Sequence, residues 1–317
     1  MSRKIILPFL LFLGSLPGLY GQWTVTSTSA GSGITYHAPQ GESQRVVAGT
    51  TLPEQGKIVV QADRKLNLVY GNKKISLEGP ADILLTELKK QINRQQTGNF
   101  LGRFWKFISS SVTDTSKAED VENYHRKYMT NTRAGIRGFG KDSTRLALPE
   151  YFSGRLTTPK APLRWSPVAG AESYRIQVRE RDGDGRILEA VTRSNGYDLQ
   201  LDALACEPAA VYVLEIGPAT GKSAATEAFF TYEPGADKAL TDNLLTSQEA
   251  ELLTEEESAL YFAYWLEKEQ FHAAARTIYE NLLVADPDNR LYRKTYASFL
   301  VRMDVPDQAR EVLKSVP

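Results

Sequence analysis

The chain has 317 residues, of which 42% are hydrophobic and 24% are charged. This composition is that of an ordinary globular protein, and it excludes collagen-like chains and extended disorder. Because 38 basic residues balance 38 acidic residues, the zero net charge argues against a general nucleic-acid-binding surface. The length suffices for two or three domains, each with a core of its own.

The first 21 residues have the three parts of a secretory signal peptide: basic Arg3 and Lys4, an apolar run over residues 5–13, and small or turn-forming residues up to Gly21. The apolar run is too short to span a membrane, which needs about 20 such residues. We therefore expect cleavage after residues 1–21 and a mature protein that is periplasmic or otherwise exported. A lipoprotein needs a cysteine at the cleavage point, and the chain has only Cys206, so we expect no lipid anchor.

Residues 22–85 are predicted to form a β domain, because short apolar runs alternate with turns at Gly49, Gly56 and Gly71-Asn72. The expected strands include Val46-Val47 and residues 58–60, 66–70 and 75–77. The stretch resembles the periplasmic domain of FecR-like regulators in Ala48-Gly49-Thr50-Thr51-Leu52, Gly56-Lys57-Ile58-Val59-Val60 and Ile75-x-Leu77-x-Gly79-Pro80-Ala81. The resemblance implies a sensor of a receptor or a small ligand. Such sensors carry a membrane span, which a cleaved signal peptide would not leave behind.

Residues 86–158 are predicted to form a basic connector with helical and irregular parts. Residues 86–141 contain six lysines and five arginines against five acidic residues, a net charge of +6. Within residues 88–112, large apolar side chains would cover one broad face of a helix: Phe100, Leu101, Phe104, Trp105, Phe107 and Ile108. That face could pack on a neighbouring β domain, or residues 100–108 could make peripheral contact with a membrane. A second, shorter helix is expected near residues 121–129.

Residues 159–234 show the alternation of half-buried antiparallel strands. Apolar side chains recur at every second position in Tyr174, Ile176 and Val178, and again in Tyr212, Leu214 and Ile216. The run Asp182-Gly183-Asp184-Gly185 predicts the turn of a hairpin between two strands. The region resembles fibronectin type III-like domains in the motif Leu163-Arg164-Trp165-Ser166-Pro167-Val168-x-Gly170-Ala171-x2-Tyr174-Arg175-Ile176. This resemblance implies a β-sandwich in which Trp165 is a buried core residue.

Residues 240–317 are predicted to form helical hairpins, because shifting the region by 34 residues superposes residues of similar character. The pairs are Phe262 with Tyr296, Ala263 with Ala297, Leu266 with Leu300, Ala275 with Ala309, and Tyr279 with Leu313. A 34-residue period is typical of the tetratricopeptide repeat, and Ala275-x3-Tyr279-x2-Leu282-x4-Pro287 resembles the second helix of that family. A first helix is expected over residues 255–267, and residues 244–253 could supply an earlier one. The number of stacked repeats stays open, and so does a plain hairpin with coincidental spacing.

Repeats of this family usually bind extended peptides or other proteins, so the resemblance implies a protein-binding face. The candidate contacts on that exposed face are Tyr261, Tyr264, Lys268, Tyr292 and Arg293. Residues 240–286 have two basic residues against ten acidic ones, a net charge of −8. These acidic residues could attract the basic connector or steer a separate partner.

The residue types of most catalytic and metal sites are scarce. The three histidines, His37, His125 and His272, lie too far apart in the sequence for a local metal motif. Residues 135–141 resemble the start of a phosphate-binding loop, but Asp142 stands where Ser or Thr would ligate magnesium. The glutamates at 255–257 suit the N-terminal end of a helix dipole better than catalysis. We therefore expect no catalytic residues, no metal and no cofactor.

The predicted fold class is multidomain α+β, with two antiparallel β domains followed by a C-terminal α-helical repeat. The expected function is that of a non-catalytic, exported scaffold of a bacterial cell envelope, which binds other envelope proteins or peptides and no nucleic acid. The alternative is a periplasmic FecR-like sensor of a receptor or small ligand.

Overall fold

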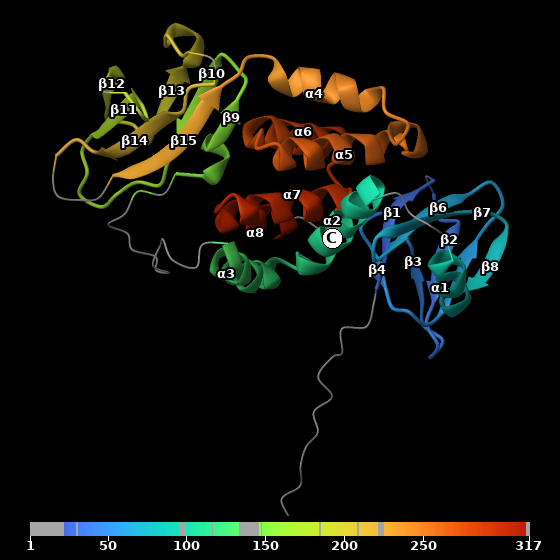
Figure 1. The fold of residues 1–317 in the computed structure, drawn as a ribbon. Coiled ribbons are helices and arrows are strands. Elements are labelled where there is room, and N and C mark those ends of the chain that lie inside the picture. The colour runs from blue at the N-terminus through green and yellow to red at the C-terminus, as the bar shows by residue number, and fades with distance from the viewer. Residues whose placement is uncertain are drawn as a thin grey trace, which may run out of the picture.

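Two β domains lie on either side of a stack of helices (Figure 1). The computed structural model describes residues 22–29, 31–94, 99–115, 117–132, 146, 148–183, 185–207, 209–220 and 225–314. The predicted signal peptide and the motif at 135–141 lie outside these residues. The predicted fold class is confirmed, because antiparallel sheets occupy the first two thirds of the chain and packed helices the last third. Within the described ranges, no helix is both long enough and apolar enough to span a membrane.

The N-terminal domain consists of two four-stranded antiparallel sheets, with strand orders β4-β1-β6-β7 and β3-β2-β5-β8. The strands are β1 (Trp23–Thr28), β2 (Ile34–His37), β3 (Ser43–Arg45), β4 (Thr51–Leu52), β5 (Lys57–Val60), β6 (Lys65–Tyr70), β7 (Lys73–Glu78) and β8 (Ala81–Leu84). Trp23, Leu52 and Ile58 are fully buried in its core. Helix α1 (Leu85–Asn93) adds Leu88 and Ile92 to the same core, so this unit extends beyond residue 85.

One detail of the N-terminal prediction is wrong. Val46-Val47 lie in a loop between β3 and β4, where the Val46 amide donates to the carbonyl of Ile34 at 3.0 Å. Val46 is nevertheless buried as part of the N-terminal core. The predicted helix with a broad apolar face is confirmed, because residues 100–108 all lie in α2 (Asn99–Asp114), which joins the helical stack. The start of the segment 88–112 belongs to α1, which completes the N-terminal core.

The middle domain has a five-stranded sheet of order β12-β11-β14-β15-β9 and a two-stranded sheet of β10 and β13. Its strands are β9 (Gly154–Leu156), β10 (Lys160–Arg164), β11 (Tyr174–Glu180), β12 (Arg186–Thr192), β13 (Gly196–Gln200), β14 (Tyr212–Pro218) and β15 (Thr226–Tyr232). The expected hairpin joins β11 to β12. Trp165 is buried, with its ring centroid 5.4 Å from that of Tyr174. β9 pairs parallel to β15, so this sheet begins inside the segment that the sequence assigned to the connector.

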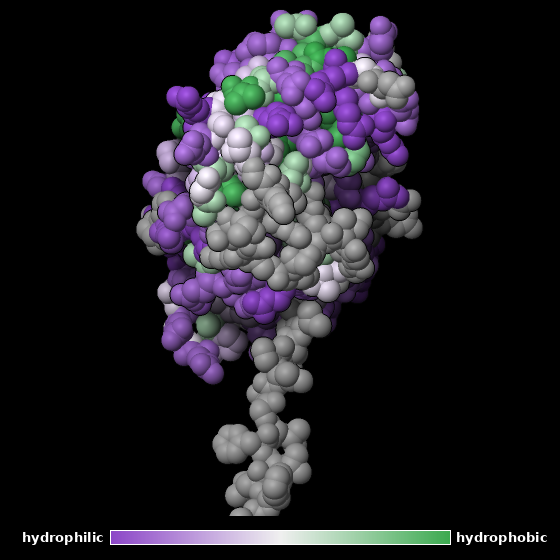
Figure 2. Space-filling view, turned by 90° about the vertical axis from the view of Figure 1, so that its left-hand side faces the viewer, coloured by the Kyte–Doolittle hydropathy of each residue, from purple (hydrophilic) through white to green (hydrophobic). Residues whose placement is uncertain are grey.

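Figure 2 shows the molecule from the side of the middle domain. Hydrophilic residues cover most of the described surface in this view, and the hydrophobic ones form small groups toward the top. Val191 and Phe229 are large apolar side chains of this domain that are exposed, at 63% and 46%. The middle domain therefore presents a largely polar surface on this side.

The C-terminal part contains two helical hairpins at the expected 34-residue offset. Its helices are α4 (Ala236–Leu245), α5 (Glu255–Lys268), α6 (His272–Ala285), α7 (Arg290–Arg302) and α8 (Pro306–Lys314). The second helices begin at His272 and Pro306, and the turns before them contain left-handed Gln270 (φ 65°) and Asp304 (φ 62°). Because both pairs are 34 residues apart, the spacing is a property of the backbone and not a coincidence of side chains. The earlier helix, α4, ends at Leu245 and does not cover residues 244–253.

Helix α3 (Val121–Thr132) covers the end of the stack formed by α7 and α8. Its His125 Nε2 lies 2.8 Å from Asp304 Oδ1 in the α7–α8 turn, and Arg310 Nη1 donates to Glu122 Oε2 at 2.8 Å. Stacked hairpins need their outer apolar faces covered. Here a helix from much earlier in the sequence supplies that cover for α7 and α8.

Candidate functional site

The five predicted contact residues do not form an exposed face. Tyr261, Tyr264 and Tyr292 are buried, with 2%, 4% and 4% of their surface exposed. Lys268 is exposed and Arg293 is half-buried. The expectation of exposure is therefore wrong for the three tyrosines, and a partner-binding role for Lys268 and Arg293 stays a prediction.

Helix α2 covers the tyrosines of α5. The Phe104 ring lies 5.3 Å from Tyr261 and 5.8 Å from Tyr264, and the Phe107 ring lies 4.9 Å from Tyr264. Phe104, Trp105 and Val112 are themselves buried. The apolar face of α2 therefore packs against the first helices of the two hairpins and the sheet, as the packing interpretation predicts. Peripheral membrane contact by residues 100–108 stays a prediction.

A buried ion pair holds the two hairpins together. Arg302 of α7 binds Glu267 of α5 at 2.8 Å, and both side chains are about nine-tenths buried. Tyr279 of α6 donates to Glu267 Oε1 at 2.8 Å, and the Arg302 guanidinium lies 4.8 Å from the centre of the Phe107 ring. Burial raises the pKa of the Tyr279 hydroxyl well above its usual range, so it stays a donor. Three helices and α2 thus share one polar centre inside the stack.

Arg293 is used within the hairpins. Its Nε donates to the carbonyl of Pro287 at 2.6 Å, and its Nη1 donates to the carbonyl of Val312 at 3.0 Å. Next to it, burial raises the pKa of the Tyr292 hydroxyl, with further contributions from Glu256 and Asp286. Arg293 therefore supports the repeat itself, although the sequence pattern favoured an outward role.

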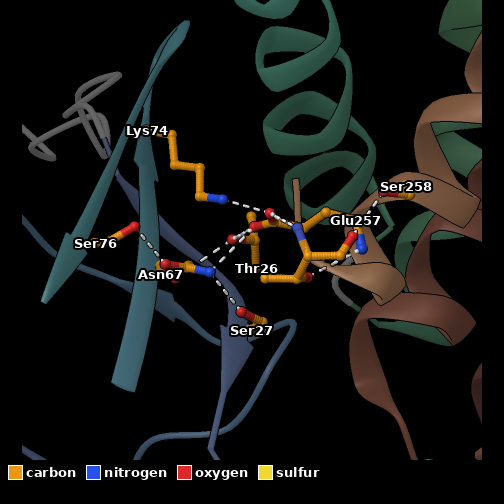
Figure 3. Close-up of polar contacts among 8 residues, drawn as sticks. Thr26, Ser27, Asn67, Lys74, Ser76, Glu257 and Ser258 are labelled. Atoms are coloured by element: carbon orange, nitrogen blue, oxygen red, sulfur yellow. Dashed lines mark hydrogen bonds and ion pairs between the residues drawn. The ribbon is translucent and has the colours of Figure 1, made fainter. Parts of the chain in front are cut away.

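The start of α5 is attached to the N-terminal domain through Glu257 (Figure 3). Its carboxylate is 1% exposed. Thr26 Oγ1 donates to it at 2.9 Å, Lys74 forms an ion pair with it, and the backbone amide of Thr254 donates to it at 3.0 Å. The Lys74 ammonium also lies 5.2 Å from the centre of the Trp105 ring. One carboxylate thus connects the sheet, α2 and α5.

The start of α7 is attached to the same domain through Gly49. Lys294 Nζ donates to the Gly49 carbonyl at 2.9 Å, and burial lowers the pKa of this lysine. Gly49 has φ +81°, and a Cβ there would overlap the backbone nitrogen of Leu291. Glycine is required at this position for two reasons, because other residues disfavour this backbone conformation and because the approach leaves no space for a side chain.

The opposite ends of the helices are attached to the middle domain. In the α5–α6 turn, the Gln270 carbonyl accepts from the Arg155 amide at 2.9 Å, and the Arg155 guanidinium lies 4.0 Å from the centre of the Phe271 ring. In the α7–α8 turn, the Met303 carbonyl accepts from the Glu150 amide at 3.0 Å. The hairpins therefore contact the N-terminal domain at one end and the middle domain at the other.

Sequence reasoning did not find Glu257 and Gly49 as junction residues. Thr254 and Glu257 match the sequence pattern of a capping box, and the structure contains this capping box. Gly49 was predicted to lie in a turn, and its positive φ agrees with that. Neither pattern contains information about the distant residue that Glu257 or Gly49 contacts.

The three histidines lie in separate parts of the molecule. His37 lies 3.1 Å from Thr35 Oγ1, His125 contacts Asp304, and His272 Nδ1 lies 3.1 Å from the Ser153 carbonyl.

Among the residues that the structure describes, no three His, Cys, Asp or Glu side chains are grouped in a way that could hold a metal ion.

A scan against protein-family models found no match for the chain, and a search of curated proteins found no similar sequence. The class that the fold and these junctions define is an α+β protein in which two helical hairpins connect two β domains.

Proposed function

We propose that this protein is a non-catalytic, exported binding scaffold of a bacterial cell envelope, in which the helical hairpins brace the two β domains in one arrangement. The observation that carries the proposal is the double attachment of the hairpins, at Glu257 and Gly49 on one side and at Gln270 and Met303 on the other. Helix α5 has 14 residues, so at 1.5 Å per residue the brace is about 21 Å long.

The three resemblances fit this role. The two four-stranded sheets agree with a FecR-like domain, and the sandwich with buried Trp165 agrees with a fibronectin type III-like domain. The paired hairpins with left-handed turns agree with a tetratricopeptide repeat. In such repeats the inner face usually holds a partner, but α2 occupies that face here, so partner contacts fall to the β domains.

The test is site-specific photo-crosslinking of the full chain in an envelope extract. A photoreactive residue replaces one exposed side chain in each part: Leu84 in the N-terminal domain, Val191 in the middle domain, or Val284 on α6. We expect cross-linked partner proteins with the probe at position 84 or 191 and not at 284. Partners recovered only at position 284 would refute the bracing role and restore the hairpins as the binding surface.

A second candidate function is the FecR-like sensor. It is favoured by one observation, a polar pocket on the N-terminal domain beside the Glu257 junction.

A further inference from the structure

A pocket of about 410 Å³ opens where the N-terminal domain meets the helical stack. Its floor is the outer face of β1, β6 and β7, and the wall opposite runs from η4 (Ala250–Leu252) to the first turn of α5. The pocket shares Asn67 and Lys74 with the Glu257 network in Figure 3. Its size and its position at a domain junction are those of sites that bind small molecules.

The floor of the pocket is a row of polar residues on three neighbouring strands. Ser27, Asn67 and Ser76 are direct cross-strand neighbours. Ser76 Oγ donates to Asn67 Oδ1 at 2.6 Å, and Asn67 Nδ2 donates to Ser27 Oγ at 2.7 Å. Within the described part of the chain, the Ser27 hydroxyl thus keeps its hydrogen for a ligand, and the Ser76 hydroxyl keeps its acceptor capacity. The row offers a donor at one end and an acceptor at the other.

The charges of the floor are already balanced. Lys74 is paired with Glu257, and Lys65 is paired with Glu78 at 2.7 Å. The opposite wall presents Leu252, which is 67% exposed and supplies an apolar surface. The floor therefore leaves no charge for a ligand to balance, but it does call for groups that donate and accept together with an apolar face.

The rim of the pocket disfavours anions. Glu251 and Glu256 are exposed carboxylates on the η4–α5 side. They repel a phosphate or a carboxylate and accept hydrogen bonds from hydroxyl groups.

We propose that this pocket binds a neutral saccharide of one or two rings. Each sugar hydroxyl donates and accepts, which matches the Ser27 and Ser76 ends of the floor, and the C–H face of a ring packs on Leu252. Because the floor and the Glu257 junction share Asn67 and Lys74, a bound saccharide also stabilises the attachment of the N-terminal domain to α5. The saccharide site rests on the second candidate function, that of a sensor, and names its ligand class. It does not depend on the bracing role, so either proposal can fail without the other.

Isothermal titration calorimetry of the full chain with cellobiose and with diacetylchitobiose tests this proposal. We expect Leu252→Asp to weaken disaccharide binding about tenfold, because it removes the apolar wall. Leu252 is exposed, so this change leaves the fold intact. The matched control is Leu245→Asp, because Leu245 is also exposed and does not line the pocket. Its affinity should equal that of the unmodified chain.

A second variant tests the floor. Ser76→Ala removes one hydrogen-bonding group and should weaken binding about fivefold. The site is disproved if neither disaccharide binds, or if Leu252→Asp and Leu245→Asp bind equally well. Dialanine is the comparison ligand: if it binds at this pocket and the disaccharides do not, the saccharide class is wrong.

Discussion

The carboxylate of Glu257 has partners on both sides of a domain junction. It closes the capping box of α5 with Thr254. It also accepts a hydrogen bond from Thr26, 231 residues away in the sequence, and forms an ion pair with Lys74, 183 residues away. A buried charge is costly unless it is paired and hydrogen-bonded, so these partners must stay in place together. A residue that caps a helix thereby also positions a domain.

We predict that Glu257→Ala lowers the free energy of unfolding by about 3–5 kcal/mol, because it leaves Lys74, whose side chain is only 14% exposed, without its counter-ion. Glu256→Ala is the matched control, since Glu256 occupies the same helical turn and is exposed. It should change the free energy by less than about 0.5 kcal/mol. Urea denaturation measures both, and equal losses would show that the network does not hold the junction.

A second residue-scale prediction concerns pH. Arg155 Nε donates to Glu233 Oε1 at 3.0 Å and Nη2 donates to Oε2 at 2.5 Å, and this bidentate pair lowers the pKa of Glu233. The folded state then binds this proton less readily than the unfolded state, so the stabilisation is present above the ordinary carboxyl pKa and is lost as the pH falls. The difference in melting temperature between the unmodified chain and Glu233→Gln should be largest near pH 7. It should narrow below about pH 4, and a gap that stays constant would contradict this.

At the scale of elements, α2 packs against the hairpins of its own chain and covers one face of the helical stack. Its sequence is rich in aromatic residues because it packs between a sheet and the first helices of two hairpins. The fully buried Phe104 ring lies between Trp105 and the tyrosines of α5. Amphipathic helices with such a broad apolar face are stable only when the face is covered.

Phe104→Ala should therefore lower the free energy of unfolding by about 3–5 kcal/mol, the usual cost of removing a buried ring. Lys106→Ala, on the exposed side of the same helix, should change it by less than about 0.5 kcal/mol. Both values come from thermal or urea unfolding. A loss below about 1 kcal/mol for Phe104→Ala would mean that α2 is not integral to the stack.

At the scale of the whole molecule, the hairpins place two β domains at the two ends of one brace. A single extended core includes the middle domain, α2, the hairpins and Val69 of the N-terminal sheet. The N-terminal domain joins this core through the packing of α2 on its sheet and through Glu257, Gly49 and their partners. Apolar packing, a few polar contacts and one close backbone approach therefore hold the N-terminal domain in position.

Gly49→Ala should release that domain, because the new Cβ would overlap α7. Spin labels on cysteines at Ala62 and Arg193, in a Cys206→Ser background, report the distance between the two β domains. We expect one narrow distance distribution for the unmodified chain and a broad one for Gly49→Ala. Gly41→Ala is the control, since Gly41 also has a positive φ of 90° but has nothing within 4 Å of an added Cβ. A broad distribution in the unmodified chain would contradict the brace.

Much of the fold was predictable from local sequence patterns. The period of two at Tyr174, Ile176 and Val178 predicted β11, and the 34-residue offset predicted both hairpins. The loop at Val46 was predicted to be a strand, because two adjacent apolar residues indicate burial but do not distinguish a buried loop from a buried strand. The candidate site was less predictable, since Tyr261 and Tyr292 carry the same apolar signal whether they face a partner or the chain itself.

By itself, the sequence determined the α+β fold class, strands such as β11 and β14, and the spacing of the hairpins, because these follow from local patterns of residues. Only the tertiary structure decided which faces remain open. Phe104 and Tyr261 meet although they lie far apart in the sequence, and Thr26 reaches Glu257 across 231 residues. Contacts of that range depend on how complete elements pack, and no local pattern of residues encodes them.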